Sequence, residues 1–251
     1  MIVQRNYSQL TCQACSEGAG LAFDFTMAFQ PIVNIRSRSI FGYEALVRGT
    51  NQESAAEILG QVNDDNRYRF DQVCRVKAIQ LAARLDLRAF LSINFLPNAV
   101  YRPETCIRTT LEAAAKYNFP SDHIIFEVTE GERVTNHQHL IEIFQEYKRL
   151  GFKTAIDDFG AGYAGLNLLA DFQPDIVKID MDLTRDIHTH KPRRAIVLGI
   201  LKVCEELGCQ VIAEGIEQPE ELAVLHDAGV HLFQGYLFAR PGFEHLPQPQ
   251  L

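Results

Sequence analysis

Seven short apolar runs along the chain each end in a polar residue that can bind or orient a hard cation. The runs read FGYE, LSIN, IIFE, TAIDD, DIVK, VIAE and HLFQ, and the residues that end them are Glu44, Asn94, Glu127, Asp157 with Asp158, Lys178, Glu214 and Gln234. One such residue alone is usually a capped or paired side chain at a strand end. Seven in one chain favour a shared site. Converging carboxylates need a compensating charge, because repulsion and desolvation otherwise raise their pKa values.

Oxygen ligands without thiolate or imidazole select a hard divalent cation, Mg²⁺ or Mn²⁺. Asp157 and Asp158 are adjacent and are expected just beyond a strand, where the regular alternation of side chains breaks. One of them can then bridge two ions while its neighbour binds a single ion. Two ions about 3.5–4 Å apart activate water and hold a phosphodiester in line. The leading interpretation is therefore metal-dependent phosphodiester hydrolysis.

Alternating β-type runs and amphipathic stretches must position these residues. The pattern predicts strands at 28–33, 40–46, 90–94, 124–128, 153–157, 176–179, 210–214 and 232–236. It predicts helices at 70–85, 111–117, 140–150, 195–207 and 220–228, with Gly151 and Gly208 as C-terminal caps and Pro219 in a first turn. Eight strands alternating with helices indicate an α/β protein with a (β/α)8 barrel, whose chemistry lies at the carboxyl ends of the strands.

One connection departs from the barrel pattern. Residues 34–39 join the first two strands and are too few for a parallel crossover, which needs a dozen or more residues. We therefore expect a modified TIM barrel with an antiparallel first strand. The barrel domain is expected at 23–243, after an N-terminal extension at 1–22 and before a C-terminal tail at 244–251.

Composition narrows the class of protein. The 251 residues include 24 Lys and Arg against 32 Asp and Glu, a formal net charge of −8, which argues against a nucleic-acid polymer as partner. No apolar run is long enough to span a membrane, and no secretory signal is visible at the N-terminus. The six cysteines then indicate reduced thiols and a cytoplasmic location.

The chain resembles the EAL-domain family of cyclic di-GMP phosphodiesterases over residues 26–242. The segments that carry the resemblance are FQPI at 29–32, YEALVR at 43–48, SIN at 92–94, FEVTE at 126–130, DDFGAGY at 157–163, VKID at 177–180, AEGIE at 213–217 and FQGY at 233–236. The family has a barrel with an antiparallel first strand. It hydrolyses one phosphodiester bond of cyclic di-GMP and releases linear 5′-pGpG.

The resemblance also implies a role for each matching residue. Glu44, Asn94, Glu127 and Asp157 would hold a first ion, and Asp157, Asp158 and Glu214 a second. Lys178 would orient or deprotonate the attacking water, while Gln234 and Glu217 support the water and metal. Either Glu214 or a metal-bound hydroxide could share the role of base with Lys178. Gln30 and Arg48, together with Gln234 and Asn94, would face the substrate.

The loop after the paired aspartates is the main departure from the family pattern. By resemblance Glu130 would steady this loop, which links substrate binding to dimer contacts, so we expect a homodimer. Ala164 and Gly165 stand where many members carry Ser, and we expect an effect on rate or regulation.

Two further functions stay open, a cyclic di-GMP receptor or scaffold on the same fold and an enzyme acting mainly on linear dinucleotides. Cys12 and Cys15 form a CxxC pair that is either two ordinary thiols, a redox sensor or half of an inter-chain zinc site.

Overall fold

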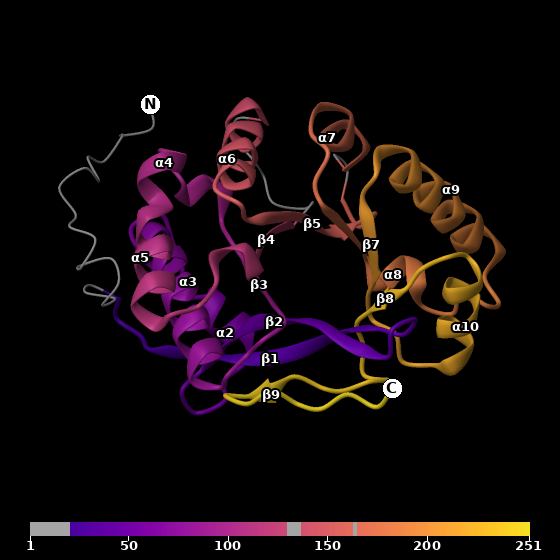
Figure 1. Cartoon of the computed structure of the whole chain (residues 1–251), viewed down its shortest axis with the longest axis horizontal. Coiled ribbons are helices and arrows are strands. Elements are labelled where there is room, and N and C mark those ends of the chain that lie inside the picture. Colours follow the sequence, from indigo (N-terminus) through magenta and orange to yellow (C-terminus); the bar gives the residue numbers. More distant parts are fainter. Residues whose placement is uncertain (1–20, 130–136, 163–164) are drawn as a thin grey trace.

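The structure is a computed structural model that describes residues 21–129, 137–162 and 165–251 (Figure 1). Helices pack around the outside of a closed sheet, as the alternating pattern predicts. The strands are β1 Phe25–Asn34, β2 Ser39–Gly49, β3 Phe90–Asn94, β4 Ile124–Thr129, β5 Lys153–Phe159, β6 Ile176–Ile179, β7 Gln210–Ala213, β8 Leu232–Phe233 and β9 Gly242–Phe243. The α-helices are α2 Ala55–Leu59, α3 Arg67–Arg84, α4 Pro103–Cys106, α5 Arg108–Tyr117, α6 His137–Arg149, α7 Gly165–Asp171, α8 Met181–Thr184, α9 Lys191–Leu207 and α10 Pro219–Asp227. Two short 3₁₀ turns, Pro97–Ala99 and Ser121–His123, complete the described elements.

The sheet closes on itself through its first strand. Strands β2 to β8 are parallel neighbours in chain order, whereas β1 lies antiparallel between β8 and β2. The turn between β1 and β2 is a short hairpin, as its length requires. The predicted modified TIM barrel with an antiparallel first strand is confirmed.

Two apolar layers stabilise the barrel. The larger one lies between the sheet and the surrounding helices, and the smaller one fills the barrel interior. The interior layer consists of Ile32, Ile125, Ala155, Ile176, Ile212 and Leu232, all at most 4% exposed. Side chains alternate between the two faces of a strand. A residue two positions away from a member of this interior layer therefore also points inward.

The ends of the predicted elements differ from the observed ones in a consistent way. Helices α3, α5, α6 and α9 begin three or four residues before their predicted starts, because their first turns are mostly polar and carry no apolar periodicity. The predicted caps are correct, since Gly151 and Gly208 both have positive φ, at 89° and 71°. Strands β7 and β8 stop one and three residues short of the predicted ends, because the backbone turns into loops there.

The segment at 244–251 lies against the first two strands. Short strand β9 pairs with β1, and the Glu244 N–H donates to the Met27 carbonyl at 3.1 Å. The Tyr43 hydroxyl donates to the Pro247 carbonyl at 2.9 Å. The segment predicted as a tail therefore contacts both β1 and β2, and Figure 1 shows the C-terminal end of the chain on that side of the barrel.

Candidate metal centre and active site

The carboxyl ends of the parallel strands place the predicted polar residues in one layer inside the barrel. Glu127, Asp157, Lys178, Glu214 and Gln234 each follow a residue of the interior apolar layer by two positions. Gln30 instead precedes Ile32 by two, because β1 runs in the opposite direction. Gln30 is thereby paired in register with Glu44 on β2. The alternation that builds the core thus also points these polar side chains toward one end of the barrel interior.

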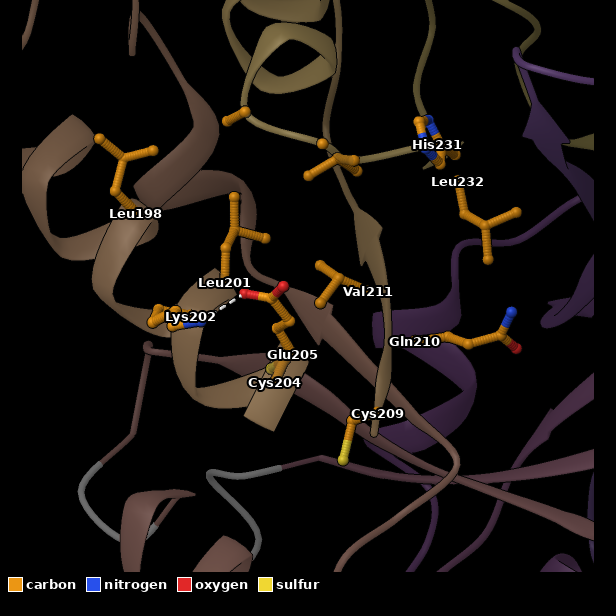
Figure 2. Close-up of a pocket in the computed structure, with 13 residues that line it drawn as sticks. Leu198, Leu201, Lys202, Cys204, Glu205, Cys209, Gln210, Val211, His231 and Leu232 are labelled. Carbon is orange, nitrogen blue, oxygen red and sulfur yellow. Dashed lines mark hydrogen bonds and ion pairs between the residues drawn. The ribbon is translucent and has the colours of Figure 1, made fainter. Parts of the chain in front are cut away.

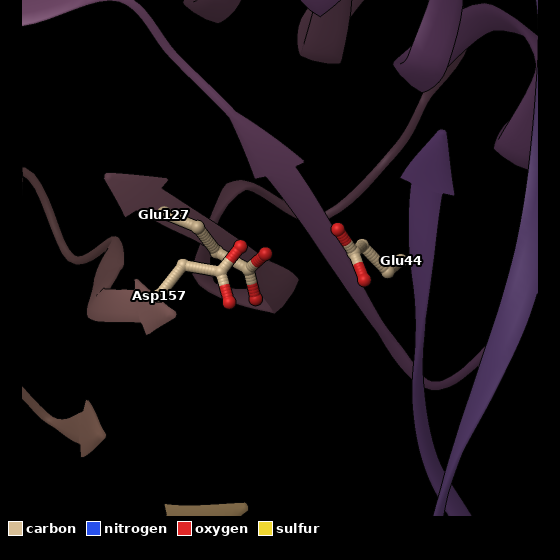
Figure 3. A group of neighbouring side chains, drawn as sticks. All are labelled: Glu44, Glu127 and Asp157. Carbon is tan, nitrogen blue, oxygen red and sulfur yellow. The ribbon is translucent and has the colours of Figure 1, made fainter. Parts of the chain in front are cut away.

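Two carboxylate triads form in this layer and share Asp157. Glu44, Glu127 and Asp157 have ligand oxygens within 4.8 Å of one another, and so do Asp157, Asp158 and Glu214. Figure 3 shows the carboxylates of Glu127 and Asp157 side by side, with Glu44 approaching from β2. Asn94 completes the first triad, since its amide donates to Glu44 Oε1 at 2.8 Å. Asp157 is the residue common to both triads, and its predicted role as a bridging ligand stays a prediction.

Asp158 reaches the second triad through an irregularity in β5. The strand continues to Phe159, so the two aspartates lie within it and not beyond it as predicted. The β5–β6 register shifts between Ile156 and Phe159, and Asp158 has a φ of 52°. In regular alternation adjacent side chains point to opposite faces. The bulge allows both carboxylates to serve one site.

Lys178 lies at the centre of both triads and is fully buried. Its ammonium Nζ is 2.9 Å from Asp157 and Glu214, 3.0 Å from Glu127 and 3.4 Å from Glu44. Burial opposes the charge on Lys178, but the four carboxylates together outweigh burial and raise its pKa well above the usual value. Lys178 is therefore a protonated hydrogen-bond donor at neutral pH.

A single ammonium does not balance the acidic groups around it. Burial, together with the charges of Glu44 and Asp157, raises the pKa of Glu127 to about 8 despite the opposing effect of Lys178. Burial and the neighbouring charge of Asp157 raise the pKa of Asp158 to about 6. The same two causes raise the pKa of Glu214 well above its usual value. A divalent cation would supply the missing positive charge, and an all-oxygen donor set fits Mg²⁺ or Mn²⁺.

The amide of Gln234 and the hydroxyl of Ser92 hold two of these carboxylates in place. Gln234 donates to Glu44 Oε2 at 2.7 Å and to Gln30 Oε1 at 3.3 Å. Ser92 donates to Glu127. The sequence analysis did not single out Ser92, although it lies two residues before Asn94 and must share its inward face.

The remaining predicted residues lie further out or outside the described chain. Arg48 donates to the neighbouring Val47 carbonyl at 2.7 Å. Glu217 forms a bidentate ion pair with Arg185, whose two Nη atoms each lie 3.2 Å from a carboxylate oxygen. The structure gives neither residue a contact with the triads, and their predicted roles stay predictions. Glu130, Ala164, Cys12 and Cys15 lie outside the described residues, and Gly165 is the first residue of α7.

A cavity of about 500 Å³ lies elsewhere, beside the first residues of β7 and β8 (Figure 2). Helix α9 contributes Leu201 and Glu205 to it, and the strand starts contribute Val211 and Leu232. It contains none of the residues of the two triads, and Glu214 of the second triad follows the opposite end of β7.

The model of the EAL domain family matches residues 18–241. This chain belongs to the EAL domain family. It is 61% identical, with a TM-score of 0.89, to a standalone versatile EAL protein from Vibrio cholerae O395 whose structure was solved in its cyclic di-GMP-bound form. That match covers 92% of this chain and 98% of the other.

Two longer proteins contain a related EAL domain. BlrP1 of Klebsiella pneumoniae, solved with manganese and cyclic di-GMP, is 37% identical with a TM-score of 0.85, and the match covers 90% of this chain and 58% of BlrP1. The blue light- and temperature-regulated antirepressor BluF of Escherichia coli K12 is 37% identical over 88% of this chain and 55% of BluF. This EAL chain thus spans about half the length of BluF. Other curated relatives are named cyclic di-GMP phosphodiesterases.

In the described ranges, no helix combines the length and apolarity needed to cross a membrane.

Proposed function

We propose that this EAL chain is a phosphodiesterase that hydrolyses cyclic di-GMP to linear 5′-pGpG and depends on Mg²⁺ or Mn²⁺. The observation that carries the proposal is the pair of carboxylate triads that share Asp157 around a buried lysine. The relatives support the same substrate, because solved EAL structures contain cyclic di-GMP and one of them also contains manganese.

Two groups of oxygen donors support two ion positions in this proposal. Glu44, Asn94, Glu127 and Asp157 would hold one ion, and Asp157, Asp158 and Glu214 the other. Bound divalent cations lower the pKa of water and neutralise charge on the phosphate. In the overall reaction a water oxygen bonds to one phosphorus, the bond from that phosphorus to the 3′ oxygen breaks, and the 3′ oxygen takes up a proton.

The chain's own residues orient the water and the phosphate. The Lys178 ammonium, held among four carboxylates, donates hydrogen bonds and keeps its proton, so it orients water better than it removes a proton. Burial raises the pKa of Glu214, so Glu214 is a better proton acceptor than Lys178. Gln234 and Gln30 keep Glu44 oriented, and Arg48 offers a guanidinium suited to a phosphate or a guanine edge.

The test is hydrolysis of cyclic di-GMP by the purified chain in Mg²⁺, Mn²⁺, Ca²⁺ or EDTA, with the products separated by chromatography. We expect 5′-pGpG with Mg²⁺ or Mn²⁺ and none with EDTA. Glu44→Ala should abolish turnover, while Glu205→Ala, which removes an exposed carboxylate of α9, should leave it unchanged. Unchanged hydrolysis by Glu44→Ala would contradict the metal assignment.

A receptor is the second candidate, because the relative BluF is named an antirepressor. A receptor would bind cyclic di-GMP tightly and release no product in any of the four conditions. An enzyme that prefers linear dinucleotides would instead cleave 5′-pGpG faster than cyclic di-GMP.

A further inference from the structure

A buried ion pair in helix α3 lies behind β3, whose last residue, Asn94, is a candidate metal ligand. Asp71 and Arg75 are one helical turn apart, with Asp71 Oδ2 2.9 Å from Arg75 Nη2 and both side chains at most 1% exposed. Replacing such a pair with apolar residues is often neutral or stabilising, so burial alone does not explain it. The role of the pair must therefore be inferred from the contacts that Asp71 and Arg75 make.

The guanidinium of Arg75 is enclosed by aromatic rings. Its central carbon lies 4.9 Å from the ring centroid of Phe126, 5.4 Å from that of Phe95 and 5.6 Å from that of Tyr147. Burial raises the pKa of Tyr147 to about 12, so its hydroxyl is neutral and accepts from Arg75 Nη1 at 2.7 Å. These contacts restrict Arg75 to a single position.

Two of these rings are chain neighbours of predicted metal ligands. Phe126 precedes Glu127, so the ring lies on the outer face of β4 while the carboxylate lies on the inner face. Phe95 follows Asn94, and its N–H donates to the Glu127 carbonyl at 3.0 Å.

Asp71 binds the backbone of the segment that follows β3. Its Oδ1 accepts from the Leu96 N–H at 2.8 Å, immediately after Asn94 and Phe95. The ion pair therefore binds the backbone after β3 and the rings behind β3 and β4 in one network.

We infer that Asp71 and Arg75 are positioning residues that keep Asn94 and Glu127 in place for metal binding. The inference rests on the proposed function, since it assigns this network to the proposed metal centre. Residues that orient metal ligands from behind typically change metal affinity by about 10–100-fold when replaced. A similar loss is expected here, with the fold retained.

Two variants separate positioning from stability. Arg75→Lys keeps the positive charge but removes the planar guanidinium, and with it the contacts with the three rings and the hydrogen bond to Tyr147. The double variant Asp71→Leu/Arg75→Met removes the pair and is expected to unfold near the wild-type temperature. Val197→Ala is the control, because Val197 is a buried core residue of α9, away from α3, and its truncation lowers stability without touching the network.

The first measurement is Mn²⁺ binding by calorimetry on each folded chain without nucleotide, and the second is hydrolysis of cyclic di-GMP against Mn²⁺ concentration. Both network variants should bind Mn²⁺ at least about tenfold more weakly and should recover kcat at high Mn²⁺. Val197→Ala should bind as the wild type does.

Wild-type Mn²⁺ affinity in either folded network variant would overturn the inference, and so would an equal loss in Val197→Ala. If one network variant fails to fold, the other decides the question. A wild-type chain that binds no Mn²⁺ would contradict the proposed function itself and, with it, this inference.

Discussion

Replacing Lys178 with Met removes the buried ammonium at nearly constant volume and leaves its four carboxylate neighbours facing one another. In the metal-free variant no positive charge at position 178 offsets the repulsion among these carboxylates, whereas a bound divalent ion would offset it. Breaking a buried ion pair by removing one partner typically costs about 3–5 kcal/mol. We expect that loss in EDTA at pH 8 and a much smaller loss in saturating Mg²⁺.

The expected shift in unfolding temperature follows from the size of the chain. Unfolding entropy is about 2.1 cal/mol/K per residue, or roughly 0.5 kcal/mol/K for a chain of this length, so the loss corresponds to about 6–10 °C. The defect should shrink at low pH. Glu127 has a folded pKa of about 8 against a usual value of 4.5, so ionisation favours the unfolded state as pH rises through this window.

The assay is thermal unfolding of both chains in EDTA and in Mg²⁺ at pH 5 and pH 8. Lys202→Met is the matched control, because its ammonium pairs with Glu205 and Glu206 on the exposed face of α9. It should change stability by less than about 1 kcal/mol. A Lys178→Met chain that is as stable as the wild type in EDTA, or equally destabilised with and without Mg²⁺, would refute the assigned electrostatics.

Three further expectations follow from the structure. Protons compete with metal at Glu127 and Asp158, because their pKa values are raised to about 8 and about 6. Mn²⁺ affinity measured by calorimetry should therefore fall steadily from pH 9 to pH 5. A constant affinity would contradict this competition. Gly235→Ala would place a Cβ 2.1 Å from a backbone oxygen beside the site and should cost about 1–3 kcal/mol in urea unfolding. Gly199→Ala, with open space around it in α9, should be neutral or stabilising, which makes it the control. Burial raises the pKa of the Cys204 thiol to about 12, so a thiol reagent should label it only after unfolding; rapid labelling of the native protein would refute its burial.

Local pattern was enough to predict the barrel and the position of most candidate site residues at the carboxyl ends of its strands. In the structure, the alternation of side chains puts Glu127, Asp157 and Lys178 on the face that also carries the interior apolar layer. The short connection at 34–39 required an antiparallel hairpin, which the structure contains. Both inferences depend on neighbours in the chain and therefore needed no tertiary information.

Element ends and side-chain partners were harder to predict. The polar first turns of the helices carry no apolar signal, so their starts were placed too late. Asp157 and Asp158 were expected just beyond the strand, yet they lie within β5, where the register shifts. Asp71 and Arg75, spaced like an exposed helical ion pair, are buried because α3 is enclosed on both sides.

The sequence by itself determined the residue types at the strand ends, their alternation and the direction of the first strand. Only the tertiary structure decided that Lys178 contacts four carboxylates at once, including Glu44, which lies 134 positions away in the chain. The physical reason is barrel closure. Pairing of β1 with both β2 and β8 brings all the strand ends around one axis, and the distances among their charges depend on that closure.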